Sequence, residues 1–312
     1  MISNLEGTAQ IFLANVERIQ QKLAEANQEV SSGMKISVPS DAPDQIAPLL
    51  QLRSDLAQNN QVQSNLALAQ TDATVADSAI ASAIQLVNTA QTVASQATDV
   101  SLSATDRISL ANQIQSIQQQ MVALSNTQVQ GRYVFSGDQD QTPAYQLNTG
   151  VDFIGNGVVQ VSTSASTRQV QDPAGGSFPV SETASDIFDA RNADGSCASD
   201  NVFASLETLN VALKNAMGSD TSAIQAAAEN FQTALTQLNS AQGFYGSVEN
   251  RIQSAQAFAS NQNTQLQTQV AGIQDADVAS EALQLSEANT QLSAAFQAQA
   301  RMPTKTLFDY LA

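Results

Sequence analysis

The chain has 312 residues, with 29 Asp or Glu, 12 Lys or Arg and no His, so its formal charge is −17. Its basic residues are scattered singly, whereas affinity for nucleic acid comes from clustered Lys and Arg, so we expect no nucleic-acid partner. Without His and with the single Cys197, the sequence excludes a zinc site, a disulfide framework and a Ser-His-Asp triad. We therefore expect no catalytic residue, no cofactor and no metal.

Ala, Gln, Ser, Asn and Thr dominate the sequence, while aromatic residues make up 5% and charged residues 13%. This composition is typical of long helices with polar faces. No apolar run approaches the roughly 18 residues that span a bilayer, and the N-terminus lacks the pattern of a cleaved signal peptide. We expect no membrane partner and, if the chain is exported, a route without cleavage.

Residues 2 to 30 place apolar or Ala side chains at alternating steps of three and four, which is the spacing of a heptad seam. The seam consists of Ile2, Leu5, Ala9, Phe12, Val16, Ile19, Leu23, Ala26 and Val30. Gly33 predicts the end of this helix, and Asp41 is expected to cap the start of the next one.

Residues 49 to 130 contain neither Gly nor Pro, which predicts long helices. One seam recurs every seven residues through Leu52, Asn59, Leu66, Ala73, Ile80, Val87 and Ala94. Ser103 and Asp106 have the spacing of a capping box, so we predict a helical hairpin whose second helix starts there.

Residues 131 to 195 hold eight of the 14 Gly residues and six aromatic residues, which predicts a β-rich segment. Asn156-Gly157 and Gly175-Gly176 are turn signals within it. Helical spacing resumes from residue 203 to residue 217 and, after a break at Gly218-Ser219-Asp220, continues from residue 224 to residue 255. A last heptad stretch follows Asp277 through Val278, Leu285, Leu292 and Phe296.

These elements predict a mainly α, elongated fold with a small β-rich insertion between long N- and C-terminal helices. We expect three domains. Residues 1–45 with 265–312 form a terminal coiled-coil assembly domain, residues 46–132 with 200–264 form a long-helix bundle, and residues 133–199 form a β-rich outer domain. The terminal seams are apolar on one side only, so we expect neighbouring copies to order them.

Two parts of the chain carry a resemblance to a known family. Val30-Ser-Ser-Gly33-Met-Lys35-Ile36, followed by Pro39-Ser-Asp41-Ala42-Pro43, resembles the N-terminal signature of the bacterial flagellin family. Residues 243–252 and 273–281 are similar to the family's C-terminal long helix and last segment. The family usually has a second acidic residue where Ala42 stands, so no bond is carried over to that position.

Within the family, residues 131–137, Thr142-Pro143 and the end of the chain are more similar to members that join hook and filament than to filament subunits. The resemblance implies an extracellular structural subunit of the bacterial flagellum, with its terminal helices in an inner tube. The implied partners are further copies of itself, hook-associated protein 1, flagellin and a flagellar export chaperone. Flagellin, the main filament subunit, is the alternative.

The candidate site is an assembly interface on the terminal seams and on the apolar tail after Pro303. It comprises Leu5, Phe12, Ile19, Leu23, Leu285, Leu292, Phe296, Leu307, Phe308 and Leu311. An exposed apolar patch of this kind is typical of a partner surface.

Other candidate sites are better interpreted as structural. Asp275 and Asp277 favour a helix cap over a metal site, because no other ligand is near in the sequence. Residues 190–201 lack the Glu that ends a calcium loop, and Tyr133 and Phe135 are expected to close the core of the insertion.

Two other classes of protein fit less well. Chemoreceptor signalling hairpins are also Gln- and Ala-rich heptad rods, but their tip is a close helical turn, whereas this chain has a Gly- and aromatic-rich middle. An enzyme is disfavoured because nothing in the sequence combines a nucleophile, a base and an oxyanion site.

Overall fold

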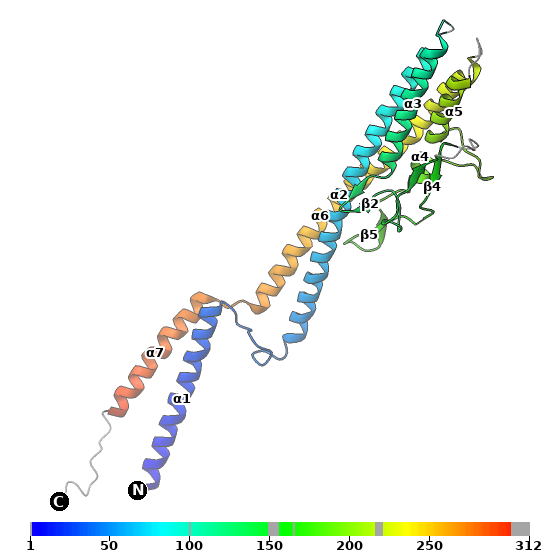
Figure 1. Ribbon diagram of the computed structural model, residues 1–312. Helices are drawn as coiled ribbons and strands as arrows, with labels where there is room; N and C mark the ends of the chain where they lie inside the picture. The colour runs from blue at the N-terminus through cyan, green and yellow to red at the C-terminus, as the bar shows by residue number, and fades with distance from the viewer. Residues whose placement is uncertain (1, 100, 149–155, 165, 216–220, 301–312) are drawn as a thin grey trace, which may run out of the picture. The chain divides into compact units, whose positions relative to one another are not determined.

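The computed structural model describes residues 2–99, 101–148, 156–164, 166–215 and 221–300 (Figure 1). Its helices are α1 (Ile2–Ser32), α2 (Ile46–Ala97), α3 (Ala104–Ser125), α4 (Ala184–Phe188), α5 (Val202–Asn215), α6 (Ser222–Gln274) and α7 (Val278–Ala300). This order confirms the predicted mainly α fold with a small β insertion. None of the described helices has the length and apolar character needed to cross a membrane.

Three antiparallel two-stranded ribbons form the regular part of the insertion. They pair β1 (Gln128–Val129) with β2 (Arg132–Tyr133), β3 (Tyr145–Leu147) with β4 (Val158–Gln160), and β5 (Gln169–Gln171) with β6 (Ser177–Pro179). Tyr145 lies opposite Gln160 and Val170 opposite Phe178. The predicted turn before β4 is confirmed, since Gly157 has a φ of +73° and a Cβ there would collide with the Gln118 side chain.

The chain divides into two compact units. The terminal unit contains residues 1–58 and 262–312, and the central unit contains residues 59–261. Helices α2 and α6 each contribute residues to both units. The finer three-domain division stays a prediction.

The core of the central unit is rich in aromatic side chains. Phe135 packs edge-on against Phe188 and Tyr245, with ring centroids 5.7 and 6.3 Å apart. Tyr145 lies 5.0 Å from Phe203 by the same measure. Since each buried apolar side chain stabilises the fold by roughly 1.5–3 kcal/mol, this cluster joins the insertion firmly to α5 and α6. Phe135 thus closes the core as predicted, while Tyr133 is only half-buried.

The predicted seam of α2 is confirmed in the central unit. Its members Leu66, Ala73, Ile80, Val87 and Ala94 are fully buried. On α6 the buried row comprises Tyr245, Val248, Ile252, Ala255 and Ala259. The small Ala side chains on both helices permit close backbone approach, which the two long helices need in order to pack along this row.

Helix α3 begins as predicted. The Ser103 hydroxyl accepts a hydrogen bond from the Asp106 backbone N–H, and the Asp106 carboxylate accepts one from the Ser103 N–H in return. This capping box satisfies two backbone donors that no helical carbonyl reaches. The turn between α2 and α3 therefore ends at a defined residue.

A buried carboxylate organises the insertion from within. Asp189 accepts hydrogen bonds from the Tyr145 hydroxyl at 3.0 Å, from the Nδ2 atoms of Asn156 and Asn201 at 2.6 Å each, and from Arg191 Nη2 at 2.8 Å. Burial, and then the charge of Asp189, raise the pKa of the Tyr145 phenol. A buried charge is tolerated where it is paired and fully hydrogen-bonded, as it is here.

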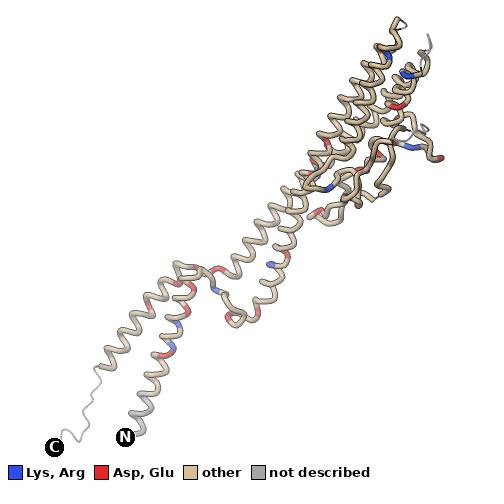
Figure 2. The backbone as a smooth tube through the Cα atoms, in the orientation of Figure 1, with Lys and Arg blue, Asp and Glu red and all other residues tan. Residues whose placement is uncertain are grey.

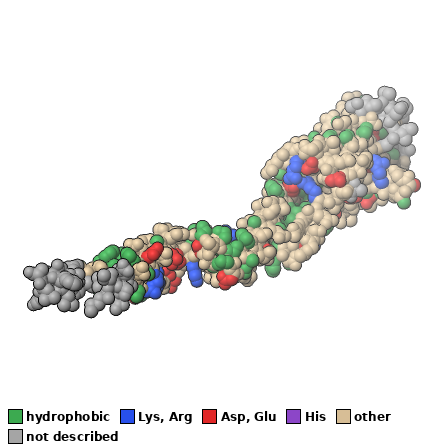
Figure 3. All heavy atoms as spheres, turned by 90° about the horizontal axis from the view of Figure 1, so that it is seen from below, with side chains coloured by type: hydrophobic (Ala, Val, Ile, Leu, Met, Phe, Trp, Pro, Cys, Tyr) green, Lys and Arg blue, Asp and Glu red, His purple; other side chains and the backbone are tan. Residues whose placement is uncertain are grey.

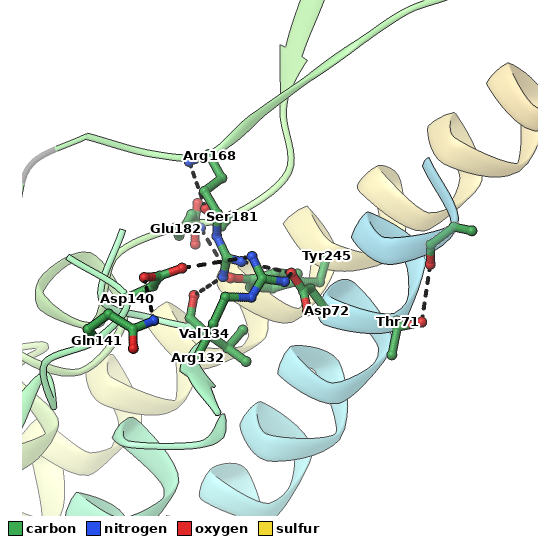
Figure 4. Close-up of polar contacts among 11 residues, drawn as sticks. Thr71, Asp72, Arg132, Val134, Asp140, Gln141, Arg168, Ser181, Glu182 and Tyr245 are labelled. Atoms are coloured by element: carbon green, nitrogen blue, oxygen red, sulfur yellow. Dashed lines mark hydrogen bonds and ion pairs between the residues drawn. The ribbon is translucent and has the colours of Figure 1, made fainter. Parts of the chain in front are cut away.

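An ion-pair cluster attaches the insertion to α2 (Figure 4). The Asp72 Oδ2 atom lies 2.7 Å from Arg168 Nη1 and 3.5 Å from Arg132 Nη2. Arg168 Nη2 also donates to the Val134 carbonyl at 2.9 Å, and Arg132 pairs with Asp140 at 3.8 Å. One carboxylate of α2 therefore holds two guanidinium groups of the insertion.

We predict that Asp72→Asn lowers the free energy of unfolding by about 2 kcal/mol, because two partly buried guanidinium groups lose their shared carboxylate. Urea unfolding followed by circular dichroism measures this change. Asp77→Asn is the matched control, since Asp77 also lies on α2 and has no ion pair within the described residues. Equal stability of the two variants would contradict the prediction.

Candidate assembly site

Helices α1 and α7 pack side by side in the terminal unit. Val16 and Ala26 of α1 and Ala288 of α7 are buried in this contact. The predicted residues Phe12, Ile19, Leu23, Leu285 and Leu292 share these rows at heptad spacing and are half-buried. The two terminal seams thus contact each other within one copy of the chain.

The other predicted interface residues lie elsewhere. Leu5 belongs to α1, but its side chain is not among those described. Phe296 lies on α7 with 51% of its side chain exposed. Leu307, Phe308 and Leu311 lie outside the described residues. Their part in assembly stays a prediction.

The two helix interruptions of the terminal unit are bonded to each other. We call residues 33–36 and 274–277 the paired break. The Lys35 N–H donates to the Gln274 carbonyl at 2.7 Å, and the Ala276 N–H donates to the Gly33 carbonyl at 3.0 Å. Gly33 ends α1 with a φ of +68°, a conformation that favours glycine. These backbone bonds place the start of α7 beside the end of α1.

Side chains reinforce the paired break. Gln274 Nε2 donates to Met34 Sδ at 2.7 Å, and Arg53 Nη2 donates to Gln274 Oε1 at 2.8 Å. Asp277 Oδ1 accepts hydrogen bonds from the N–H groups of Ala279 and Ser280, at 3.1 and 3.3 Å. Asp277 therefore caps α7, as its place in the sequence predicted.

Asp41 has a different role from the predicted one. Helix α2 begins only at Ile46, and Asp41 Oδ2 instead accepts hydrogen bonds from the N–H groups of Ser37 and Val38, both at 2.9 Å. These bonds lower the pKa of Asp41. The prediction of an α2 cap was wrong because the carboxylate folds back onto the preceding turn, whose N–H groups are closer along the chain.

Like charges meet where α1 and α7 come together. Desolvation, followed by repulsion from Glu281 of α7, raises the pKa of Glu29 of α1; Lys35 opposes the shift, while Glu25 and Asp41 add to it. The helix pair therefore contains an electrostatic conflict beside the paired break. Its packing is thin, since few side chains of α1 and α7 are fully buried.

Large apolar side chains remain exposed on the terminal unit. Ile11, Leu13 and Leu283 each expose 64% of their surface, and Figure 3 shows green side chains at the surface of this unit beside charged ones. Ile11 and Leu13 were not among the predicted interface residues, because a single heptad row does not contain them. Ile11 and Leu13 stand directly before and after Phe12 in the sequence, so on a helix they lie on the two rows that flank the Phe12 row. This position could have identified them as candidates for exposed apolar residues.

The described residues contain no group of three or more Asp, Glu or Cys side chains that could hold a metal ion. What the terminal unit does offer is a helix pair with exposed apolar and charged side chains, fixed at one end by the paired break. Such an arrangement suits protein–protein contact.

Two family models match the chain. The bacterial flagellin N-terminal helical region matches residues 4–140, and the bacterial flagellin C-terminal helical region matches residues 228–311. Together they cover more than half of the chain and include both sides of the paired break.

Two curated relatives are named flagellar hook-associated protein 3. The one from Escherichia coli K12 is 29% identical over 217 residues, covering 66% of each chain. The one from Salmonella typhimurium LT2 is 28% identical over 207 residues, covering 65% of this chain and 63% of the relative. The chain thus spans just under two thirds of the length of these relatives.

A solved structure from Vibrio parahaemolyticus, described as a flagellar hook-associated protein, shares the fold. It superposes with a TM-score of 0.64 at 19% identity and covers 75% of this chain and 100% of its own.

We predict that Glu29→Gln stabilises the terminal unit at pH 7 by less than about 1 kcal/mol, because the site is largely solvated. A raised pKa in the folded state means that ionisation of Glu29 opposes folding. The native protein therefore gains stability as pH falls through that pKa, and the variant lacks this gain. Thermal unfolding at pH 7 and pH 4 measures the difference. Glu17→Gln, on an exposed part of α1, is the control, and an identical pH response in both variants would contradict the prediction.

Proposed function

Because the chain belongs to the flagellin family, we propose that it is a structural, non-catalytic subunit of the bacterial flagellum that forms the junction between hook and filament. It assembles with further copies of itself through its terminal helices. The observation that carries this proposal is the terminal unit itself, in which the two ends of the chain form one helix pair. Such a unit presents α1 and α7 together to a neighbouring copy.

The relatives favour the junction over the filament. Both curated relatives bear the name of a hook-associated protein rather than of flagellin. Residues 131–137, which resemble junction members, supply the side chains that fix the insertion to the helices, among them Arg132 and Phe135. Flagellin is the alternative that the experiment below tests.

The proposed partners follow from a place between hook and filament. Hook-associated protein 1 lies on one side, flagellin on the other, and an export chaperone holds the chain before it leaves the cell. The chain acts outside the cell.

Seeded assembly separates the two candidate functions. Purified full-length protein is mixed with filament fragments or with hook-associated protein 1, and the product is imaged by negative-stain electron microscopy. A junction protein caps hook-associated protein 1, accepts flagellin on its other side and makes no long filament alone. Long filaments of this chain by itself would establish flagellin instead.

We predict that Leu23→Asp or Leu285→Asp leaves secretion intact but prevents stable incorporation into flagella. A carboxylate in the α1–α7 contact loses hydration and has no partner, which costs at least about 2 kcal/mol. Immunoblots of culture medium and of isolated flagella measure the two steps. Gln21→Asp and Ser286→Asp place the same charge on exposed positions of the same helices. Normal incorporation of the Leu variants would argue against a role of the α1–α7 seam in assembly.

We also predict that deletion of residues 303–312 abolishes chaperone binding, because the apolar tail contains Leu307, Phe308 and Leu311. A pull-down with the chaperone measures this. Undiminished capture of the truncated chain would place the chaperone contact elsewhere.

A further inference from the structure

Three parallel rows of side chains run along α1. The middle row, Phe12, Val16, Ile19 and Leu23, faces α7. One residue earlier lies the row Ile11, Asn15, Arg18 and Lys22, which we call the basic edge. One residue later lies the row Leu13, Glu17, Gln20 and Ala24, which we call the acidic edge. Since successive helical residues are about 100° apart, the two edges flank the α7 contact on opposite sides.

Both edges are open to solvent. Ile11 and Leu13 are each 64% exposed, and Arg18, Lys22 and Glu17 are exposed too. Within the described part of the chain, none of these three charged side chains forms an ion pair; the Arg18 guanidinium donates only to Asn15 on its own edge, at 3.3 Å. Figure 2 shows blue and red positions along α1, the first helix after the N-terminus.

The edges complement each other. Each has one large exposed apolar residue near the same level of α1, and their charges are of opposite sign between residues 11 and 24. Beyond residue 24 the row of the basic edge continues with Glu25 and Glu29. A two-fold contact through the acidic edge would bring the two Glu17 carboxylates together, whereas a contact between unlike edges pairs Glu17 with Arg18 and Lys22.

We propose that the basic edge of one copy docks on the acidic edge of the next copy, with Ile11 and Leu13 in the contact and Arg18 and Lys22 facing Glu17. Because the two edges are different surfaces, the contact is heterologous and repeats from copy to copy instead of closing a dimer. This inference rests on the proposed function, since it takes assembly through the terminal helices as given and assigns its contact surface.

Cross-linking in assembled flagella tests the contact. The chain carrying Cys197→Ser replaces the host's own copy, and Asn15→Cys and Gln20→Cys are introduced singly and together. Isolated flagella are treated with a short bis-maleimide and examined by immunoblot. We expect a ladder of dimers, trimers and larger species from the double variant and monomers from each single variant. Asn15→Cys with Gln21→Cys is the control, because Gln21 lies on the side of α1 away from the α7 contact.

The outcomes distinguish a failure of the proposed function from a failure of the proposed contact. Absence of the chain from the flagella overturns the proposed function and the contact with it. Presence without a ladder from the double variant, or a dimer from a single variant, overturns the contact alone.

A charge exchange provides an independent readout. We expect Glu17→Lys, and likewise Arg18→Glu with Lys22→Glu, to reduce the amount of incorporated protein at least tenfold, because each variant brings like charges together. Combining all three substitutions in one chain restores opposite charges at every contact and is expected to recover at least half of the native amount. Failure of this recovery, in a triple variant that is secreted and folded, overturns the proposal.

Discussion

The backbone hydrogen bonds of the paired break are the constraint on which the terminal unit depends. Helix seams alone specify which faces meet, but they leave a pair of Ala-rich helices free to slide along each other. The bonds from Lys35 to Gln274 and from Ala276 to Gly33 fix one end of both helices at once. The register of α1 against α7 follows from that fixed end, and so does the position of every exposed side chain on the pair.

The central unit differs from the terminal unit because an irregular insertion is attached to its regular helices. Its three ribbons are too short to be stable alone. They are held by aromatic packing around Phe135, by the two guanidinium groups at Asp72 and by the donors gathered at Asp189. The buried Asp189 carboxylate, which would be costly without partners, is hydrogen-bonded by Tyr145, Asn156, Asn201 and Arg191, so this polar group forms part of the core.

Much of this fold could be predicted from residue patterns. Long stretches free of Gly and Pro, the capping box at Ser103 and the turn at Gly157 are local signals, and each lies where it was expected. Asp41 was assigned wrongly because two sets of backbone donors compete for its carboxylate, and only the fold decides between them. Ile11 and Leu13 were missed for a related reason: one heptad row reveals a helix's partner face, but exposure of the flanking rows depends on what packs beside them.

The pairing of α1 with α7 also determines when the helix pair can form during synthesis of the chain. These helices are the first and last of the described chain, so the face of α1 that contacts α7 stays uncovered until α7 has been synthesised. A helix with one apolar row is marginal by itself. The α1–α7 pair therefore forms only after both of its helices are present, however early α1 itself has been made.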